Sequence, residues 1–162
     1  MRFPFPVLVC DVGGTNLRVA LCRAPGDPPK VVLKERTAAY PGLDAALASA
    51  AKVAGAAPRS ILVCAAGPVD GAKVRLTNAD WAIDGPEIAR RLDLDQGLLL
   101  NDFEAQAVAL PHLTEAMTRD ICAGTARPDA PRLVLGPGTG LGAAALLRAD
   151  GRWLVATTEA GH

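Results

Sequence analysis

Three strand-like runs lie near the start of this 162-residue chain, and in the second of them Arg18 alternates with apolar residues. Alternation of this kind is typical of strands that bury one face. The runs cover residues 7–11, 17–22 and 31–37, and turns rich in glycine or proline separate them. Because such turns join antiparallel neighbours, the sequence predicts that a sheet begins with three antiparallel strands.

Helical spacing of apolar residues begins after the third run. Leu43, Leu47 and Ala50 recur on one face, and Gly55 supplies a helix stop. The remaining elements of this part are predicted helices at 43–53, 86–92 and 103–110 and predicted strands at 61–65 and 98–100. This alternation indicates an α/β fold with a mixed sheet flanked by helices.

The C-terminal part has more strand-like than helix-like character. Residues 118–131 are loop-like and contain glycine and two prolines, as domain borders often do. A strand is predicted at 133–135, and strands at 143–147 and 153–155 pair around Asp150-Gly151, a hairpin signal. We therefore expect a second unit that begins with strands.

Composition narrows the classes of partner. Half of the residues are hydrophobic, and 17 basic residues balance 17 acidic ones. The chain is about the size of one domain and can bury a hydrophobic core. Its zero net charge produces no electrostatic field that would attract nucleic acid or an anionic membrane. A small polar metabolite is the expected partner, with no nucleic acid and no membrane.

The cysteines and the N-terminal run predict a cytoplasmic location. The four cysteines are far apart and form no Cys-x-x-Cys pair, and Cys10, Cys22 and Cys64 lie in apolar stretches, as buried thiols do. The apolar run at 3–9 is interrupted by two prolines and followed by Asp11. It is too short for a signal peptide or a membrane span.

Two glycine-rich turns follow predicted strands, one at 11–16 (DVGGTN) and one at 136–142 (GPGTGLG). Glycine allows positive φ and brings backbone N–H groups close to an anion, and a threonine hydroxyl adds a donor. Asn101 and Asp102 lie between the turns at the end of a predicted strand, where ligands bind in α/β sheets. Phosphoryl transfer is therefore the first functional hypothesis.

Five motifs, taken in order, resemble those of the bacterial glucokinase family. They are residues 11–16 (DVGGTN), 76–81 (LTNADW), 101–105 (NDFEA), 138–142 (GTGLG) and 159–162 (EAGH). The resemblance extends from Val7 to His162, whereas members of that family are considerably longer. We therefore expect this chain to correspond to an N-terminal half.

The resemblance implies the actin-like ATPase fold, related to ribonuclease H, in which two α/β lobes close over ATP and a sugar. Residues 1–110 would form the small lobe, and residues 111–162 would begin a larger lobe that is incomplete here. The implied activity is ATP-dependent phosphorylation of glucose at the 6-hydroxyl. Magnesium would arrive with ATP, and no separate metal site is expected.

The resemblance also assigns roles to single residues. Those implied to approach the phosphates and magnesium are Asp11, Gly13, Gly14 and Thr15 in the first turn and Gly138, Thr139 and Gly140 in the second. Those implied to hold the sugar hydroxyls are Asn101, Asp102, Glu159 and His162, with Asp102 as the general base. Pro137 departs from the family pattern, because it removes one backbone donor from the second turn.

Several of these residues have simpler interpretations. A carboxylate in reach of a sugar hydroxyl can take its proton as a phosphoryl group transfers, yet Asn101-Asp102 is also typical of a helix cap, and both roles can hold. Asp11 and the glycines beside it are also typical of a hairpin turn that contacts no ligand. Trp81 belongs to a motif implied to lie near the sugar, but a tryptophan in an aromatic-poor chain also serves as a packing anchor.

Other functions remain open at this point. A non-catalytic fragment that binds a sugar or a partner is the main alternative, because the chain ends at His162. A homo-oligomer would cover apolar surface that a missing half leaves exposed. Residues 138–143 match a dinucleotide fingerprint, but the segment after them is too short for its helix. A P-loop motif is absent, and no helix-turn-helix precedes the first strand, which disfavours a transcription factor.

Overall fold

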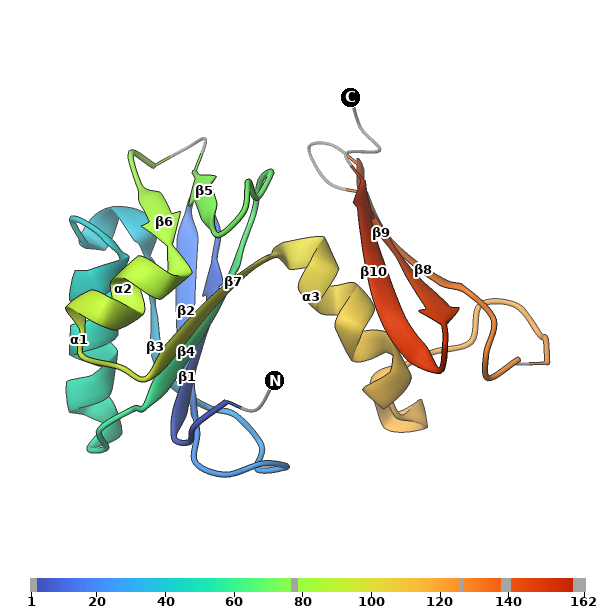
Figure 1. Ribbon diagram of the computed structural model, residues 1–162, viewed down its shortest axis with the longest axis horizontal. Helices are drawn as coiled ribbons and strands as arrows, with labels where there is room; N and C mark the ends of the chain where they lie inside the picture. The colour runs from blue at the N-terminus through green and yellow to red at the C-terminus, as the bar shows by residue number, and fades with distance from the viewer. Residues whose placement is uncertain (1–2, 77–78, 126, 138–140, 159–162) are drawn as a thin grey trace. The chain divides into compact units, whose positions relative to one another are not determined.

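The computed structural model describes residues 3–76, 79–125, 127–137 and 141–158 (Figure 1). The chain divides into two compact units, Met1–Asp102 and Phe103–His162. The expected border after residue 110 falls inside the second unit. The assignment of the units to the two lobes of a kinase stays a prediction.

A five-stranded mixed sheet forms the centre of the first unit, with the order β3-β2-β1-β4-β7. Its strands are β1 (Val7–Val12), β2 (Asn16–Cys22), β3 (Lys30–Arg36), β4 (Ser60–Ala65) and β7 (Gln96–Asn101). β1, β2 and β3 pair antiparallel as predicted, while β1, β4 and β7 run parallel. The parallel strands place their carboxyl ends at one edge of the sheet.

Helices α1 (Leu43–Ala54) and α2 (Gly85–Arg91) cover one face of this sheet (Figure 1). The apolar face of α1 is buried, and Gly55 ends the helix in the left-handed conformation, as its sequence predicts. Alternate residues of the strands, such as Leu8, Val19 and Val63, are buried in the same core. Burial of one strand face accounts for the alternation in β2, where Leu17, Val19 and Leu21 are buried.

A small hairpin between β4 and α2 was not predicted. It consists of β5 (Lys73–Arg75) and β6 (Ala82–Asp84), each too short to show a period. Trp81 precedes β6 and is only 7% exposed, which agrees with its role as a packing anchor. Asp84 then caps α2 by accepting a hydrogen bond from the backbone N–H of Glu87 at 3.0 Å.

The second unit is built on a three-stranded antiparallel sheet with the order β10-β9-β8. Its elements are α3 (Asp102–Ala109), which begins at the border of the units, the 3₁₀ helices η2 (Leu110–His112) and η3 (Glu115–Met117), and the strands β8 (Arg132–Pro137), β9 (Leu141–Ala149) and β10 (Arg152–Thr158). β9 and β10 form the hairpin predicted around Asp150-Gly151, and both turn residues have positive φ. A small core joins α3, through Ala107, to Ala144 and Leu146.

The cysteines differ in burial, and none of the four, all within the described residues, forms a disulfide. Cys10 is buried as expected, whereas Cys22 and Cys64 are half-buried and Cys122 is exposed. Burial, together with nearby Cys64 and Asp11, raises the pKa of the Cys10 thiol far above its ordinary value. Cys10 therefore stays protonated at neutral pH and acts as a core residue.

Within the residues that the structure describes, no helix has both the length and the apolar character needed to cross a membrane.

Candidate functional site at the carboxyl edge of the first sheet

The first glycine-rich turn closes the hairpin of β1 and β2, as predicted. Val12 and Leu17 are the last paired residues, and the backbone N–H of Gly13 donates to the Asn16 carbonyl at 2.9 Å. The sequence predicts that this N–H faces a phosphate, but in the structure it forms a hydrogen bond within the turn itself. Gly13 also lacks the positive φ expected of such a turn.

Thr37 holds this turn from the neighbouring strand. It follows β3 as the first residue of η1 (Thr37–Ala39) and is fully buried. Its hydroxyl donates to the Gly13 carbonyl at 2.7 Å, and its backbone N–H donates to the Thr15 carbonyl at 3.0 Å. These contacts could not be predicted from the sequence, because both acceptors are backbone groups far from Thr37 along the chain.

Asp11 and Arg18 lie opposite each other on β1 and β2. Their side chains form an ion pair at 2.9 Å, with the Asp11 side chain 60% and the Arg18 side chain 53% exposed. Arg18 was missed as a residue of the site. Its spacing from Asp11 across the turn could have revealed it, because residues equidistant from a hairpin turn face the same side.

Asn101 and Asp102 lie at the same edge of the sheet as the glycine turn. Val12 pairs with Ala65, and Ala65 pairs with Asn101, so β1, β4 and β7 end side by side. Asn101 is the last residue of β7 and Asp102 the first of α3. The expected placement at a strand end is confirmed, and it is compatible with both helix capping and catalysis.

The Asn101 side chain is fixed by the loop after β4. Its amide nitrogen donates to the Gly67 carbonyl at 3.0 Å. Gly67 has φ of 114°, a conformation that other residues rarely adopt. Gly67 therefore positions Asn101, a role that could not be inferred from the sequence, although the Gly67-Pro68 turn was visible there.

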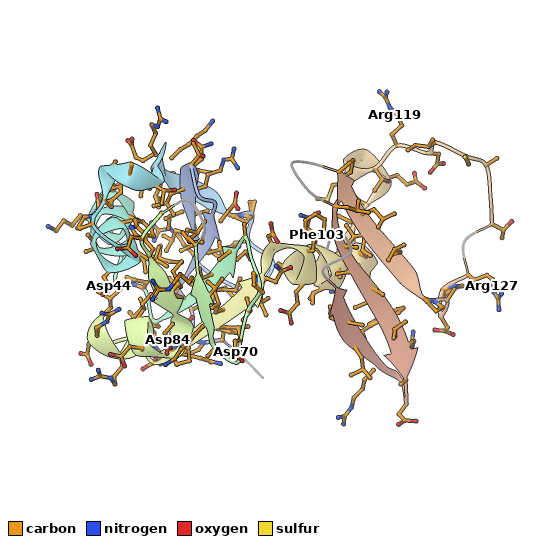
Figure 2. All side chains as sticks on the ribbon, turned by 90° about the horizontal axis from the view of Figure 1, so that it is seen from above. Asp44, Asp70, Asp84, Phe103, Arg119 and Arg127 are labelled. Atoms are coloured by element: carbon orange, nitrogen blue, oxygen red, sulfur yellow. The ribbon has the colours of Figure 1, made fainter. Side chains whose placement is uncertain are left out.

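The second glycine-rich turn joins β8 and β9 in the second unit. Gly136 pairs with Gly142 on either side of it. A side chain on either glycine would overlap the ring of Phe103, at the start of α3 (Figure 2). These two glycines make room for an aromatic ring, a packing role that the sequence reasoning did not assign to them.

Several predicted site residues lie outside the described residues. They are Gly138, Thr139 and Gly140 of the second turn, Glu159 and His162 of the last motif, and Asn78 of the motif before Trp81. Among the described residues, no three His, Cys, Asp or Glu side chains are grouped as metal ligands. The assignment of magnesium to the phosphates stays a prediction.

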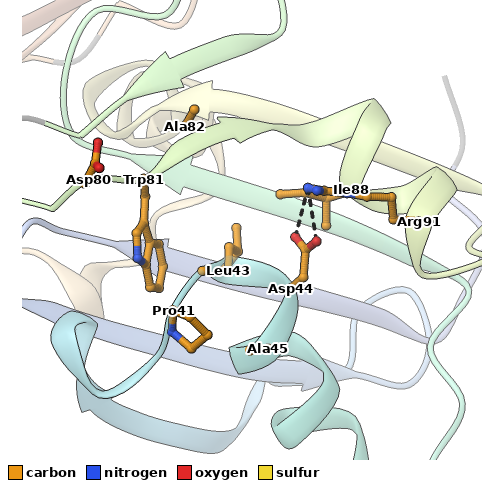
Figure 3. Close-up of a pocket in the computed structure, with 10 residues that line it drawn as sticks. Pro41, Leu43, Asp44, Ala45, Asp80, Trp81, Ala82, Ile88 and Arg91 are labelled. Atoms are coloured by element: carbon orange, nitrogen blue, oxygen red, sulfur yellow. Dashed lines mark hydrogen bonds and ion pairs between the residues drawn. The ribbon is translucent and has the colours of Figure 1, made fainter.

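A separate pocket of about 370 Å³ lies between the start of α1, β6 and α2 (Figure 3). Trp81 and Ile88 contribute to its apolar wall, and Asp44 pairs with Arg91 at 3.0 Å beside them. None of the first-rank site residues predicted from the sequence lines it. This pocket is therefore distinct from the candidate site at the sheet edge, which the glycine turn and Asn101-Asp102 form.

The architecture defines the class of protein. A solved glucokinase from an Antarctic psychrotroph is 33% identical, with a TM-score of 0.83 over 97% of this chain and 51% of that one. A ROK-family glucokinase from Streptomyces griseus, solved with glucose and AMPPNP, shares the fold at 23% identity and a TM-score of 0.60, over 97% of this chain and 50% of that one. The chain thus has the actin-like ATPase fold of the sugar kinases, as predicted.

The family follows from the sequence comparisons. A sequence model of the family described as Glucokinase matches residues 8–162, so the chain belongs to the glucokinase family. It is 39% identical to a glucokinase of Sinorhizobium medicae over 161 residues, 99% of this chain and 48% of that protein. It is 40% identical to one of Brucella suis over 161 residues, 99% of this chain and 47% of that protein. The chain spans about half the length of the curated relatives it matches.

Proposed function

We propose that this chain acts in the ATP-dependent phosphorylation of glucose at the 6-hydroxyl. Membership of the glucokinase family supports a sugar kinase. The observation that carries the proposal is the shared edge of the first sheet, where the glycine turn follows β1 and Asn101-Asp102 lie at the end of β7, two parallel strands with only β4 between them. A phosphoryl donor and a hydroxyl acceptor need such neighbouring sites, because positioning supplies much of the rate enhancement.

Asp102 is proposed as the general base. A sugar hydroxyl is a weak nucleophile, and a carboxylate within hydrogen-bond reach accepts its proton as the phosphoryl group arrives. Asn101 is proposed to bind a sugar hydroxyl. Its amide nitrogen already donates to Gly67, which fixes the orientation of the side chain before a sugar binds. Glu159 and His162 are proposed to bind further hydroxyls.

The first turn is proposed to bind nucleotide phosphates. Asp11, Gly13, Gly14 and Thr15 lie at the end of β1, and the Asp11 carboxylate is 60% exposed, so an oxygen ligand suited to Mg²⁺ is accessible there. ATP supplies the phosphoryl group, and the magnesium bound to ATP offsets the negative charge of the phosphate oxygens. Gly138, Thr139 and Gly140 are proposed as the second phosphate-binding segment. A cytoplasmic location and a small-molecule substrate complete the proposal.

Glucose phosphorylation tests this function directly. We would measure glucose 6-phosphate formed by the purified chain with Mg·ATP, comparing Asp102→Asn with Asp95→Asn. Asp95 precedes the other end of β7 and pairs with Arg59 at 2.6 Å, so it is a matched carboxylate away from the site. Loss of a general base lowers turnover by about 10²- to 10⁴-fold, whereas Asp95→Asn should retain activity close to the unsubstituted chain.

Three results would contradict parts of the proposal. Equal turnover by Asp102→Asn and the unsubstituted chain would exclude Asp102 as the base. Faster turnover of another hexose in a parallel panel would replace glucose as the preferred substrate. Binding of glucose by a folded chain that forms no product would favour the non-catalytic alternative.

A further inference from the structure

Thr37 is a buried polar residue for which the proposed function has no role. It is fully buried at the junction of β3 and η1, and its own carbonyl accepts a hydrogen bond from the Tyr40 N–H at 3.3 Å. Burial of a hydroxyl is unfavourable unless the hydroxyl is hydrogen-bonded. Here the hydroxyl is satisfied by the Gly13 carbonyl at 2.7 Å, inside the glycine turn.

The two hydrogen bonds that Thr37 donates fix the peptide group before Gly14 and the peptide group after Thr15. The hydroxyl binds the Gly13 carbonyl, and the backbone N–H binds the Thr15 carbonyl at 3.0 Å. In a trans peptide the C=O and the following N–H point in opposite directions. Because the Gly13 carbonyl points toward Thr37, the N–H of Gly14 points away from Thr37.

We propose that Thr37 is a positioning residue that orients the Gly14 N–H toward a nucleotide phosphate. This inference rests on the proposed role of the first turn in phosphate binding. Threonine suits the task because its branched side chain has few rotamers, so the hydroxyl is held on the Gly13 carbonyl. Thr37 acts through the turn and does not itself contact the nucleotide.

Three variants test this role. Thr37→Val keeps the shape and removes the hydroxyl, Thr37→Ser keeps the hydroxyl, and Ser60→Ala is the matched control. Ser60 is also fully buried and donates to a carbonyl at 2.7 Å, that of Pro4, but it begins β4 at the opposite end of the sheet. Thr37→Ala provides a second variant without the hydroxyl if valine impairs folding.

The readouts are the dissociation constant for Mg·ATP by calorimetry and amide hydrogen exchange of residues 13–16. Loss of one neutral hydrogen bond corresponds to a change of roughly 3- to 10-fold, so Thr37→Val should weaken Mg·ATP binding by about this factor. It should also speed exchange in the turn and leave glucose affinity unchanged. Thr37→Ser should restore both properties. Ser60→Ala should lower thermal stability without changing either.

Mg·ATP binding by the unsubstituted chain separates the possible failures. If that chain binds no Mg·ATP, the proposed phosphate-binding function is wrong, and the role of Thr37 is wrong with it. If it binds Mg·ATP and Thr37→Val binds equally well, only the role of Thr37 is wrong. Equal weakening by Ser60→Ala would likewise overturn it, because the effect would then follow general stability.

Discussion

The two glycine-rich hairpins of this chain are held in different ways. The turn between β1 and β2 is fixed by hydrogen bonds from Thr37 to the Gly13 and Thr15 carbonyls. At the base of the turn between β8 and β9, Gly136 and Gly142 instead leave space for the Phe103 ring. Glycines in two similar motifs thus meet different physical needs, so a glycine-rich motif does not by itself identify a phosphate contact.

The surroundings of the two hairpins differ as well. The first belongs to a sheet with a continuous core that includes residues from α1 and α2. In the second unit α3 packs with one small cluster, while Leu133, Leu135 and Leu154 remain 54% to 60% exposed. A small core contributes little to the free energy of unfolding. We therefore expect a packing change near the second hairpin to remove a larger share of the stability than a change near the first.

Gly142→Ala should have the largest effect on stability. The added methyl group would overlap the Phe103 ring, and overpacking of this kind costs about 1–3 kcal/mol. Chemical denaturation would measure the loss of stability, and amide hydrogen exchange in residues 132–158 would show where it occurs. Gly124→Ala is the control, because a side chain there would meet no atom within 4 Å.

A double substitution would show whether the ring is the cause. Gly142→Ala should cost less in a Phe103→Leu background, because the smaller side chain relieves the overlap, and double-mutant cycles measure such coupling. Equal costs in both backgrounds would mean that Phe103 does not set the requirement for glycine.

Thr37→Val should have an intermediate effect that is confined to the first hairpin. It removes the hydroxyl partner of the half-buried Gly13 carbonyl, and a hydrogen bond of this kind contributes about 0.5–1.5 kcal/mol. Denaturation together with exchange in both hairpins would locate the effect. Faster exchange in the second hairpin as well would show that the two hairpins are not held independently.

Arg18→Gln should have the smallest effect on stability. The Asp11–Arg18 pair is more than half exposed, and exposed ion pairs contribute about 0.2–1 kcal/mol. Denaturation at low and high salt should show that this small contribution shrinks as salt screens the pair. A loss larger than that of Thr37→Val would mean that the ion pair, rather than Thr37, holds the first hairpin.

Much of the first unit could be predicted from the sequence. Most of its long strands were identified as short apolar runs bounded by turn residues, and Gly55 marked the end of α1. The β5–β6 hairpin was missed because three residues are too few to show a period. The α/β class was predicted from the alternation of strand and helix patterns, whereas the actin-like fold and the family were predicted from ordered motifs.

The candidate site was predictable only in part. Asn101 and Asp102 could be placed at the sheet edge because they follow the apolar, strand-like run Leu98-Leu99-Leu100. Thr37 and Gly67 could not be found, because each acts through backbone contacts with residues distant in sequence. The roles of Glu159 and His162 stay predictions that lie outside the described residues.

Hydrogen exchange with and without Mg·ATP and glucose tests the central claim most directly, namely that both glycine-rich hairpins and Asn101-Asp102 serve one phosphoryl transfer. We predict that Mg·ATP slows exchange in residues 13–16 and 136–142 and that glucose slows exchange around residues 101–102. Unchanged exchange in both hairpins at saturating Mg·ATP would contradict the account.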